Sequence, residues 1–193
     1  MRITPLALPG LLLLEPTRRG DARGFFSEVF RADLFEDAAG PVRFVQDNHS
    51  LSAARLTVRG LHRQREPRAQ GKLVRVLRGA VLDVAVDLRP GSPSFGQHEA
   101  VELSRENWRG LFVPPGFLHG FCTLEPDTEV FYKTTEFYSA EHDEAVRWND
   151  PALGIDWPAT ESTATLSDRD RAAPLLREIG IVLPPRAGAG EGR

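Results

Sequence analysis

The sequence predicts an all-β fold, either a sandwich or a small barrel. Short apolar stretches recur from residue 3 to residue 135, and glycine and proline turns separate them. Within residues 80–88 the side chains alternate with the period of a strand, with Leu82 and Val84 on one face and Asp83 on the other. Short strands at this density are typical of sandwiches and barrels. A chain of 193 residues suits one such domain, which we expect to span residues 1–183.

The N-terminal part of the chain is expected to contain an arm, a strand and a helix. Residues 3–14 are apolar but are broken by Pro5, Pro9 and Gly10, which indicates an edge strand or an arm rather than a helix. An arm of this kind often packs on a partner subunit. Residues 20–24 have the composition of a turn, so a strand is expected at 25–30, before a short helix at 31–39.

The rest of the fold is predicted from apolar runs and the turns between them. Further strands are expected at residues 44–50, 57–63, 73–77, 80–88, 96–103, 109–113 and 128–135. After Tyr138 the pattern changes, with a helical turn expected at 140–145 and a short terminal element at 175–182. Residues 184–193 are glycine, alanine, proline and charged residues, a composition that favours a mobile tail.

Composition and charge exclude several classes of protein. With 41% hydrophobic and 26% charged residues, the chain fits neither a disordered nor a membrane class. The formal net charge of -3 provides no broad basic surface, so a nucleic-acid partner is not expected. Cys122 is the only cysteine, which rules out an intrachain disulfide and favours a cytoplasmic location. The apolar run 11–14 is too short to cross a bilayer, and no charged leader precedes it.

The stretch from Arg59 to Lys72 contains the richest chemistry in the chain. His62 lies between Arg59 and Lys72, and apolar alternation follows at once. A histidine alone is more often a hydrogen-bonded structural residue than a functional one, and isolated cations are usually solvated. Between fixed cations, however, an imidazole can exchange a proton while the cations hold negative charge. His62 is therefore a candidate acid–base residue, and Lys72 a candidate for stabilising an enolate.

A second histidine raises the question of a metal site. His119 ends the sequence Pro-Pro-Gly-Phe-Leu-His, which resembles the Pro-x-Gly-x-x-His pattern of metal-binding cupins. The companion pattern, His-x-His followed by a glutamate, is broken because Gln64 stands in place of its second histidine. His62, His119 and Glu66 remain, and these three are a poor set of ligands for a transition metal. We therefore expect a site without a metal ion.

Two tyrosines and a serine–aspartate pair have a structural explanation, and the tyrosines also have a chemical one. Tyr132 and Tyr138 are the only tyrosines, and amphipathic packing on a sheet surface explains most tyrosines of this kind. A phenol that faces a cleft can nevertheless donate a proton to a carbanion. Ser167, with Asp170 three residues later, has the spacing of a helix N-cap, which is the better explanation from sequence alone.

Taken together, these residues resemble the dTDP-4-dehydrorhamnose 3,5-epimerases from Gly20 to Leu175. Many ordered motifs carry the resemblance, among them Gly-Asp-x-Arg-Gly-Phe-Phe-x-Glu at 20–28 and Val-Arg-Gly-Leu-His-x-Gln at 58–64. The others lie at residues 46–50, 71–72, 86–89, 91–96, 115–121, 132–133, 147–151 and 166–170.

The resemblance implies a cupin-type jelly roll with a few short helices, a homodimer that exchanges its N-terminal strands, and neither a metal nor another cofactor. It assigns His62 as the general base held by Asp170, Tyr132 as the proton donor on the opposite face of the sugar, and Lys72 as the enolate-stabilising residue. It also places a second pair, His119 with Asp83, near the sugar. Further substrate-binding positions are implied at Arg23, Glu28, Gln46, Asn48, Arg59, Tyr138, Asp143 and Arg169.

The implied reaction is the epimerisation of a dTDP-4-dehydro-6-deoxyhexose at C3 and C5, in dTDP-L-rhamnose biosynthesis. Asp143 stands where the family usually has a glutamate, and Arg169 stands where a lysine is frequent, so both keep the sign of the charge. An epimerase that inverts only C3 or only C5 of a related antibiotic sugar is the main alternative, because such relatives share most of these residues. A cupin that binds sugar nucleotides without turnover, or one that uses a metal, is a third hypothesis.

Overall fold

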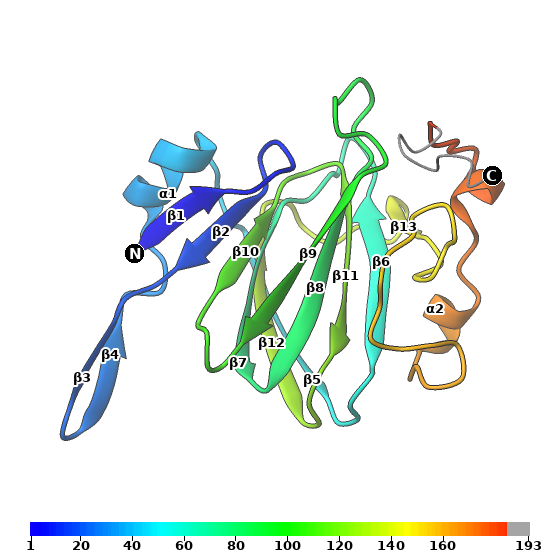
Figure 1. Cartoon of the computed structure of the whole chain (residues 1–193). Coiled ribbons are helices and arrows are strands. Elements are labelled where there is room, and N and C mark those ends of the chain that lie inside the picture. The colour runs from blue at the N-terminus through cyan, green and yellow to red at the C-terminus, as the bar shows by residue number, and fades with distance from the viewer. Residues whose placement is uncertain (185–193) are drawn as a thin grey trace, which may run out of the picture.

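Two β-sheets packed face to face make up the body of the computed structural model, which describes residues 1–184 (Figure 1). The larger sheet has the order β1 (Arg2–Pro5), β2 (Leu12–Glu15), β10 (Gly110–Val113), β7 (Lys72–Arg78), β12 (Thr128–Thr134) and β5 (Gln46–Ser52). The smaller sheet has the order β13 (Asp143–Ala145), β6 (Val58–Gln64), β11 (Phe117–Thr123), β8 (Ala80–Asp87) and β9 (His98–Ser104). Neighbouring strands are antiparallel throughout both sheets. The predicted all-β class is confirmed.

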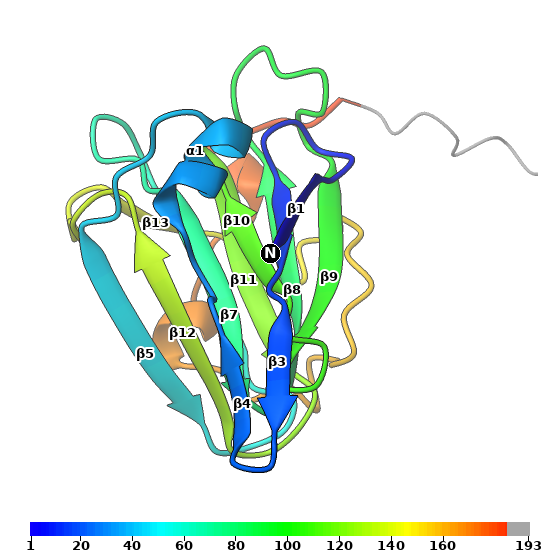
Figure 2. The ribbon, with the colours of Figure 1, turned by 90° about the vertical axis from the view of Figure 1, so that its left-hand side faces the viewer.

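Short elements surround the two sheets. A separate hairpin, β3 (Arg18–Asp21) and β4 (Gly24–Ser27), leaves the body on the side of the N-terminus (Figures 1 and 2). Helix α1 (Ala32–Ala39) packs at the larger sheet through the buried Phe35. Helix α2 (Asp168–Arg171) and a 3-10 helix (Leu176–Ile179) follow the smaller sheet. In residues 1–184 we find no helix that combines the length and apolar character needed to cross a bilayer.

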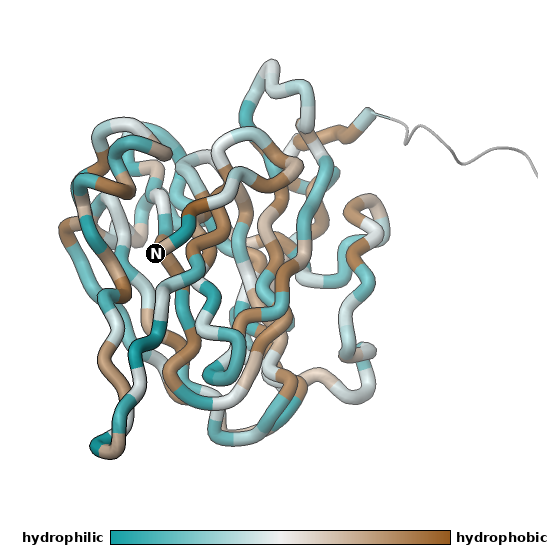
Figure 3. The backbone as a smooth tube through the Cα atoms, turned by 60° about the vertical axis from the view of Figure 1, so that its left-hand side comes forward, coloured by the Kyte–Doolittle hydropathy of each residue, from teal (hydrophilic) through white to brown (hydrophobic). Residues whose placement is uncertain are grey.

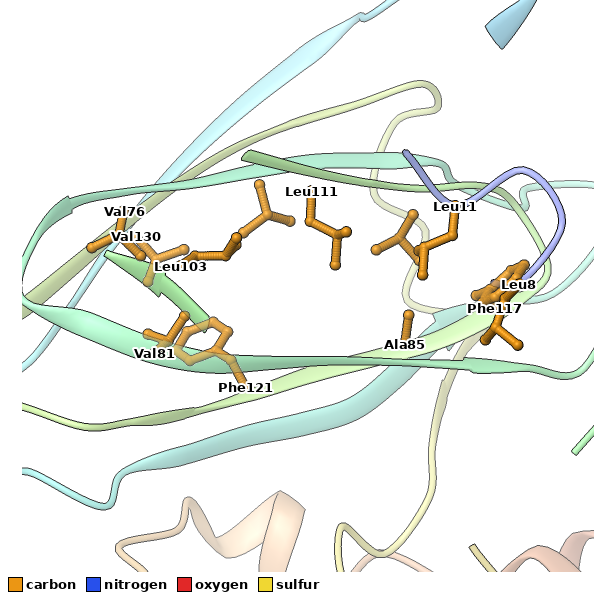
Figure 4. Packing of buried hydrophobic residues seen from close by; sticks show 12 residues of the cluster. Leu8, Leu11, Val76, Val81, Ala85, Leu103, Leu111, Phe117, Phe121 and Val130 are labelled. Carbon is orange, nitrogen blue, oxygen red and sulfur yellow. The ribbon is translucent and has the colours of Figure 1, made fainter. Parts of the chain in front are cut away.

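The core lies between the sheets, and a second apolar layer covers the smaller sheet from outside. Figure 4 shows the inner cluster, in which Val81 and Ala85 of β8 meet residues such as Leu111 of the larger sheet. The alternate residues of β8, including Val84, pack outward against the C-terminal segment, where Leu176 is buried. Strand β8 is therefore buried on both faces, which explains its nearly continuous apolar sequence. Figure 3 shows hydrophobic and hydrophilic positions interspersed along the strands.

The structure corrects several sequence-based expectations. The strand expected at 25–30 ends at Ser27, because its partner β3 is only four residues long, and Phe30 packs on Phe35 with ring centroids 5.7 Å apart. The helical turn expected at 140–145 is wrong, since residues Asp143–Ala145 pair with the edge of β6 instead. Strands β3 and β11 were not predicted. Most of the expected mobile tail, residues 185–193, lies outside the described part of the chain.

Candidate active site

A cleft opens between the sheets where β6 and β5, on opposite sheets, lie near helix α2. A cavity of about 460 Å³ occupies it, and side chains from both sheets line the walls. His62 and His119 come from the smaller sheet, while Lys72 and Tyr132 come from the larger one. An adjoining recess shares His62, Lys72, Tyr132 and Arg169 with the cavity and extends it toward the mouth. The lining of the recess also includes Gln46, Asn48, Gln64, Gln70, Tyr138 and Asp143.

Glycines bring the two histidine strands into close contact. His62 on β6 lies opposite His119 on β11 in the strand register, next to a β-bulge. A Cβ atom added to Gly60 would lie 2.6 Å from Cα of Gly120, and Gly60 has a φ of +126°, so a side chain fits neither the space nor the backbone. The sequences Gly-Leu-His and His-Gly-Phe thus place both imidazoles at one wall of the cleft.

His62 is held by a carboxylate from the far end of the chain. Its Nε2 lies 2.6 Å from Oδ1 of Asp170, which is 4% exposed in the first turn of α2. Burial acts to raise the pKa of Asp170, but the hydrogen bond and charge of His62, with help from Ser167, outweigh it and hold that pKa below its ordinary value. When Nε2 donates to this carboxylate, Nδ1 becomes the basic nitrogen of the neutral ring. The pair therefore has the arrangement of a general base and its orienting acid.

The predicted N-cap is confirmed, and it coexists with the Asp170 contact. The backbone N–H of Asp170 donates to Oγ of Ser167 at 3.1 Å, and that hydroxyl donates to Oδ2 of Asp170 at 2.9 Å. Ser167 thus fixes both the start of α2 and the carboxylate that faces His62.

Removing the Ser167 hydroxyl is expected to lower both the stability of the fold and the activity of the site. Ser167→Ala is expected to lower the free energy of unfolding by about 1 kcal/mol. It should also lower kcat about fivefold, because the carboxylate loses one neutral hydrogen bond. Urea denaturation and initial rates measure both effects. Ser162→Ala, in the exposed turn before α2, is the control, and wild-type kcat in Ser167→Ala would contradict the assignment.

A second imidazole and carboxylate pair lies beside the first. Nε2 of His119 is 2.9 Å and 3.0 Å from the two oxygens of Asp83, which is fully buried on β8. The alternation of β8 puts Asp83 on the same face as Val81 and Ala85, which lies between the sheets. The sequence predicted the alternation but not which face would be the inner one. In residues 1–184 we find no group of three or more His, Cys, Asp or Glu side chains arranged to hold a metal ion.

Burial changes the acid–base properties of Lys72 and Tyr132. Lys72 begins β7, and its Nζ lies 3.5 Å from the carbonyl oxygen of His62. Desolvation lowers the pKa of Lys72 to about 8, although the charges of Asp143 and Asp83 oppose this shift. Desolvation raises the pKa of the Tyr132 phenol, against the effect of Arg59. At neutral pH the cleft therefore presents a protonated phenol and an ammonium group that deprotonates easily.

The mouth of the cleft contains most of the remaining predicted positions. Oδ2 of Asp143 accepts a hydrogen bond from Oη of Tyr138 at 3.1 Å and forms an ion pair with Nη1 of Arg169 at 2.7 Å. Gln46 donates to Oδ1 of Asn48 at 2.9 Å on β5.

At the other end of the cavity, Nε of Arg59 donates to Oγ of Ser52 at 3.0 Å. The arginine is exposed there as a cation.

Two predicted positions do not reach this cleft. Arg23 lies at the turn of the β3–β4 hairpin with its side chain 90% exposed, and it pairs with Asp21 at 2.6 Å. Glu28 follows the same hairpin and is exposed. In Figure 1 the hairpin projects on the side of the molecule opposite α2. One chain alone therefore does not bring Arg23 and Glu28 to the other site residues.

The cavity also contains residues that the sequence reasoning missed. Phe121, Thr165 and Leu166 line it, and Gln70 lines the recess. Phe121 is two residues from His119 on β11, so the period of that strand would have placed both on one face. Thr165 forms an isolated bridge with Thr57, a contact that no local pattern indicates.

Two His–Asp pairs that face a lysine and a tyrosine across a cleft between β-sheets define an all-β protein with an acid–base site. The chain belongs to the dTDP-4-dehydrorhamnose 3,5-epimerase family, whose sequence model matches residues 5–178. A dTDP-4-dehydrorhamnose 3,5-epimerase of Sinorhizobium fredii is 52% identical, over 94% of this chain and 92% of the relative.

Solved structures of the same family agree with this assignment. The Bacillus anthracis dTDP-4-dehydrorhamnose 3,5-epimerase with TDP and PPi bound has a TM-score of 0.87 and 50% identity, over 91% of this chain and 99% of that one. A Legionella pneumophila dTDP-6-deoxy-D-glucose-3,5-epimerase in complex with dTDP-4-keto-L-rhamnose has a TM-score of 0.87 and 46% identity, over 92% and 94%.

Proposed function

We propose that this chain epimerises dTDP-4-dehydro-6-deoxy-D-glucose at C3 and C5 to dTDP-4-dehydro-L-rhamnose, in dTDP-L-rhamnose biosynthesis. The observation that carries this proposal is the placement of His62, with its Asp170 partner, and Tyr132 on opposite walls of one cleft. A base and an acid on opposite walls can remove a proton from one face of a carbon and return one to the other. Inversion needs this arrangement, whereas binding alone does not.

The chemistry follows from the ketone at C4. The carbonyl acidifies the hydrogens on C3 and C5, so Nδ1 of His62 can take a proton from either carbon while the electron pair forms an enolate. Lys72 stabilises the enolate oxygen as a cation or hydrogen-bond donor. Tyr132 then gives its proton to the opposite face of the carbon, and solvent returns a proton to Tyr132 and removes one from His62. Each inversion consumes no redox equivalent, and His119 with Asp83 holds the sugar nearby.

The low pKa of Lys72 predicts an alkaline limit to activity. Above its pKa of about 8 the amine is neutral, so kcat is expected to fall with rising pH, by up to about tenfold per pH unit. A pH–rate profile of kcat measures this decline. Lys72→Arg keeps its charge at high pH, so the decline of kcat should shift to higher pH in that variant even if its maximal rate is lower. A decline at the same pH in Lys72→Arg would show that another group causes it.

The nucleotide site is proposed to need two subunits. We infer a jelly-roll homodimer in which the β3–β4 hairpin is exchanged, so that Arg23 of the partner subunit supplies charge for the diphosphate and Glu28 of the partner subunit completes the nucleotide site. The exposure of Phe25 and Phe26, at 56% and 74%, supports this, because within one chain both rings remain largely in water even though Phe25 contacts Trp108. Gln46, Asn48 and Arg59 of the same cleft provide further contacts.

The single cysteine favours a cytoplasmic location.

Product analysis tests the proposed reaction. The purified chain is incubated with dTDP-4-dehydro-6-deoxy-D-glucose, and the ketosugar is then reduced with borohydride and hydrolysed. Inversion at both carbons gives L-rhamnose and 6-deoxy-L-talose. An enzyme that inverts C3 alone gives only 6-deoxy-D-hexoses of inverted C3, which would replace our proposal with a mono-epimerase. Recovery of unchanged substrate from several dTDP-4-ketosugars would favour a protein that binds without turnover.

A further inference from the structure

Gln64 occupies the position of a cupin metal ligand, and the structure shows what its side chain does instead. It is 3% exposed at the end of β6. Its Nε2 donates to the carbonyl oxygens of Arg68 and Phe137, at 2.6 Å and 3.1 Å, and its Oε1 accepts from the backbone N–H of Ser139 at 2.7 Å. Both amide hydrogens and the amide oxygen are therefore used to hold main-chain groups of two loops.

Three glutamine side chains hold the backbone of the second loop, in addition to its hydrogen bonds with Thr134, Glu136 and His142. Residues 136–139 connect β12 to the mouth of the cleft without strand pairing. Gln70 donates to the carbonyl oxygen of Glu136 at 2.6 Å, and Oε1 of Gln46 accepts from the N–H of Tyr138 at 3.0 Å. With the contacts of Gln64, amides from three different places fix four consecutive residues. The loop could not keep this path by backbone hydrogen bonds alone.

The loop carries Tyr138, which lines the recess at the mouth of the cleft. Phe137 and Tyr138 are each 59% exposed, and Oη of Tyr138 donates to Asp143. Asp143 is also the strand partner of Gln64 in the β13–β6 register. The hydrogen bonds of His62 and Asp170, by contrast, run to each other and to Ser167. Gln64 is thus connected to the mouth and not to the base.

We propose that Gln64 is a positioning residue, which sets Tyr138 and Asp143 for binding the nucleotide sugar and leaves the proton transfers to His62 and Tyr132. This inference rests on the proposed function. In metal-binding cupins this position carries a metal ligand. Here its side chain fixes the loop at the mouth of the cleft.

The test is Gln64→Glu, which keeps the shape of the side chain but turns a carboxylate oxygen, an acceptor, toward the two carbonyl oxygens that now receive the amide hydrogens. KM for dTDP-4-dehydro-6-deoxy-D-glucose is expected to rise about tenfold, with kcat within about threefold of wild type. The matched control is Asp150→Asn, because buried Asp150 accepts from the N–H groups of Ala152 and Leu176 at 2.9 Å and 2.7 Å, away from the cleft. Both variants exchange a single side-chain oxygen and nitrogen at a buried polar position and should lower Tm, but only Gln64→Glu should change KM.

A lowered Tm with unchanged KM, or a fall in kcat alone, would overturn the proposal. Tyr138→Ala completes a double-mutant cycle, in which the KM effects should be less than additive because Gln64 acts through Tyr138. If Gln64→Glu fails to fold, Gln64→Met takes its place with the same expectation.

A wild-type chain without turnover would refute the proposed function and leave the role of Gln64 to be tested by amide hydrogen exchange. Residues 136–139 should then exchange faster in the variant than in Asp150→Asn. Equal exchange would refute the role of Gln64.

Discussion

Replacing His62 by alanine is expected to lower kcat roughly 10³-fold, because the cleft loses the base that removes protons from C3 and C5. Initial rates with the dTDP-4-ketosugar measure the loss. His62→Asn is the companion variant, since its amide can still donate toward Asp170 but cannot take up a proton. Both variants should lose activity to a similar extent, while His62→Asn should keep more of the stability, because buried Asp170 retains a donor.

The control for this change is an exposed histidine. His49 on β5 pairs with Glu129 at 3.1 Å on the outer side of the larger sheet, and His49→Ala should leave kcat unchanged. Wild-type rates in both His62 variants would eliminate His62 as the base.

Tyr132→Phe is expected to separate proton removal from inversion. The variant keeps His62 and Lys72, so the enolate still forms, but the phenol that would protonate the carbon from the opposite wall is lost. Product formation should fall roughly 10²-fold or more, while His62 continues to exchange the substrate hydrogen with solvent on its own face. Mass spectrometry of recovered substrate from deuterated buffer measures this exchange.

The second tyrosine provides the comparison. Tyr138→Phe removes the hydrogen bond to Asp143 at the mouth and should raise KM with little change in kcat. A Tyr132→Phe variant that forms product at the wild-type rate would show that the proton comes from another group.

Local patterns predicted the strands well where apolar and polar side chains alternate. They predicted them less well where pairing with a neighbouring strand determines the secondary structure. Residues 80–88 alternate clearly, and β8 lies at Ala80–Asp87. Residues 140–145 contain alanine and glutamate, which favour a helix, but the open edge of β6 pairs with Asp143–Ala145 and this tertiary contact prevails. Strand β11 was hidden by the prolines and glycine before Phe117, which indicate a turn and in fact mark its start.

A site residue was predictable only where its own neighbours in the sequence indicate its chemistry. His62 is visible in its own sequence context, but its partner Asp170 lies 108 residues away, and spacing alone favoured a helix cap there. The resemblance to a family linked the two. The hydrogen bonds of Gln64 depend on the path of an irregular loop, so the sequence alone indicates only that a metal ligand is missing at this position.

The most direct test of the account is NMR of dTDP-4-dehydro-6-deoxy-D-glucose in deuterated buffer with the wild-type chain. A base on one wall and an acid on the other predict deuterium at both C3 and C5, together with the signals of the L-rhamno product. Deuterium at one carbon only would contradict double epimerisation. No incorporation at either carbon would contradict the enolate mechanism itself.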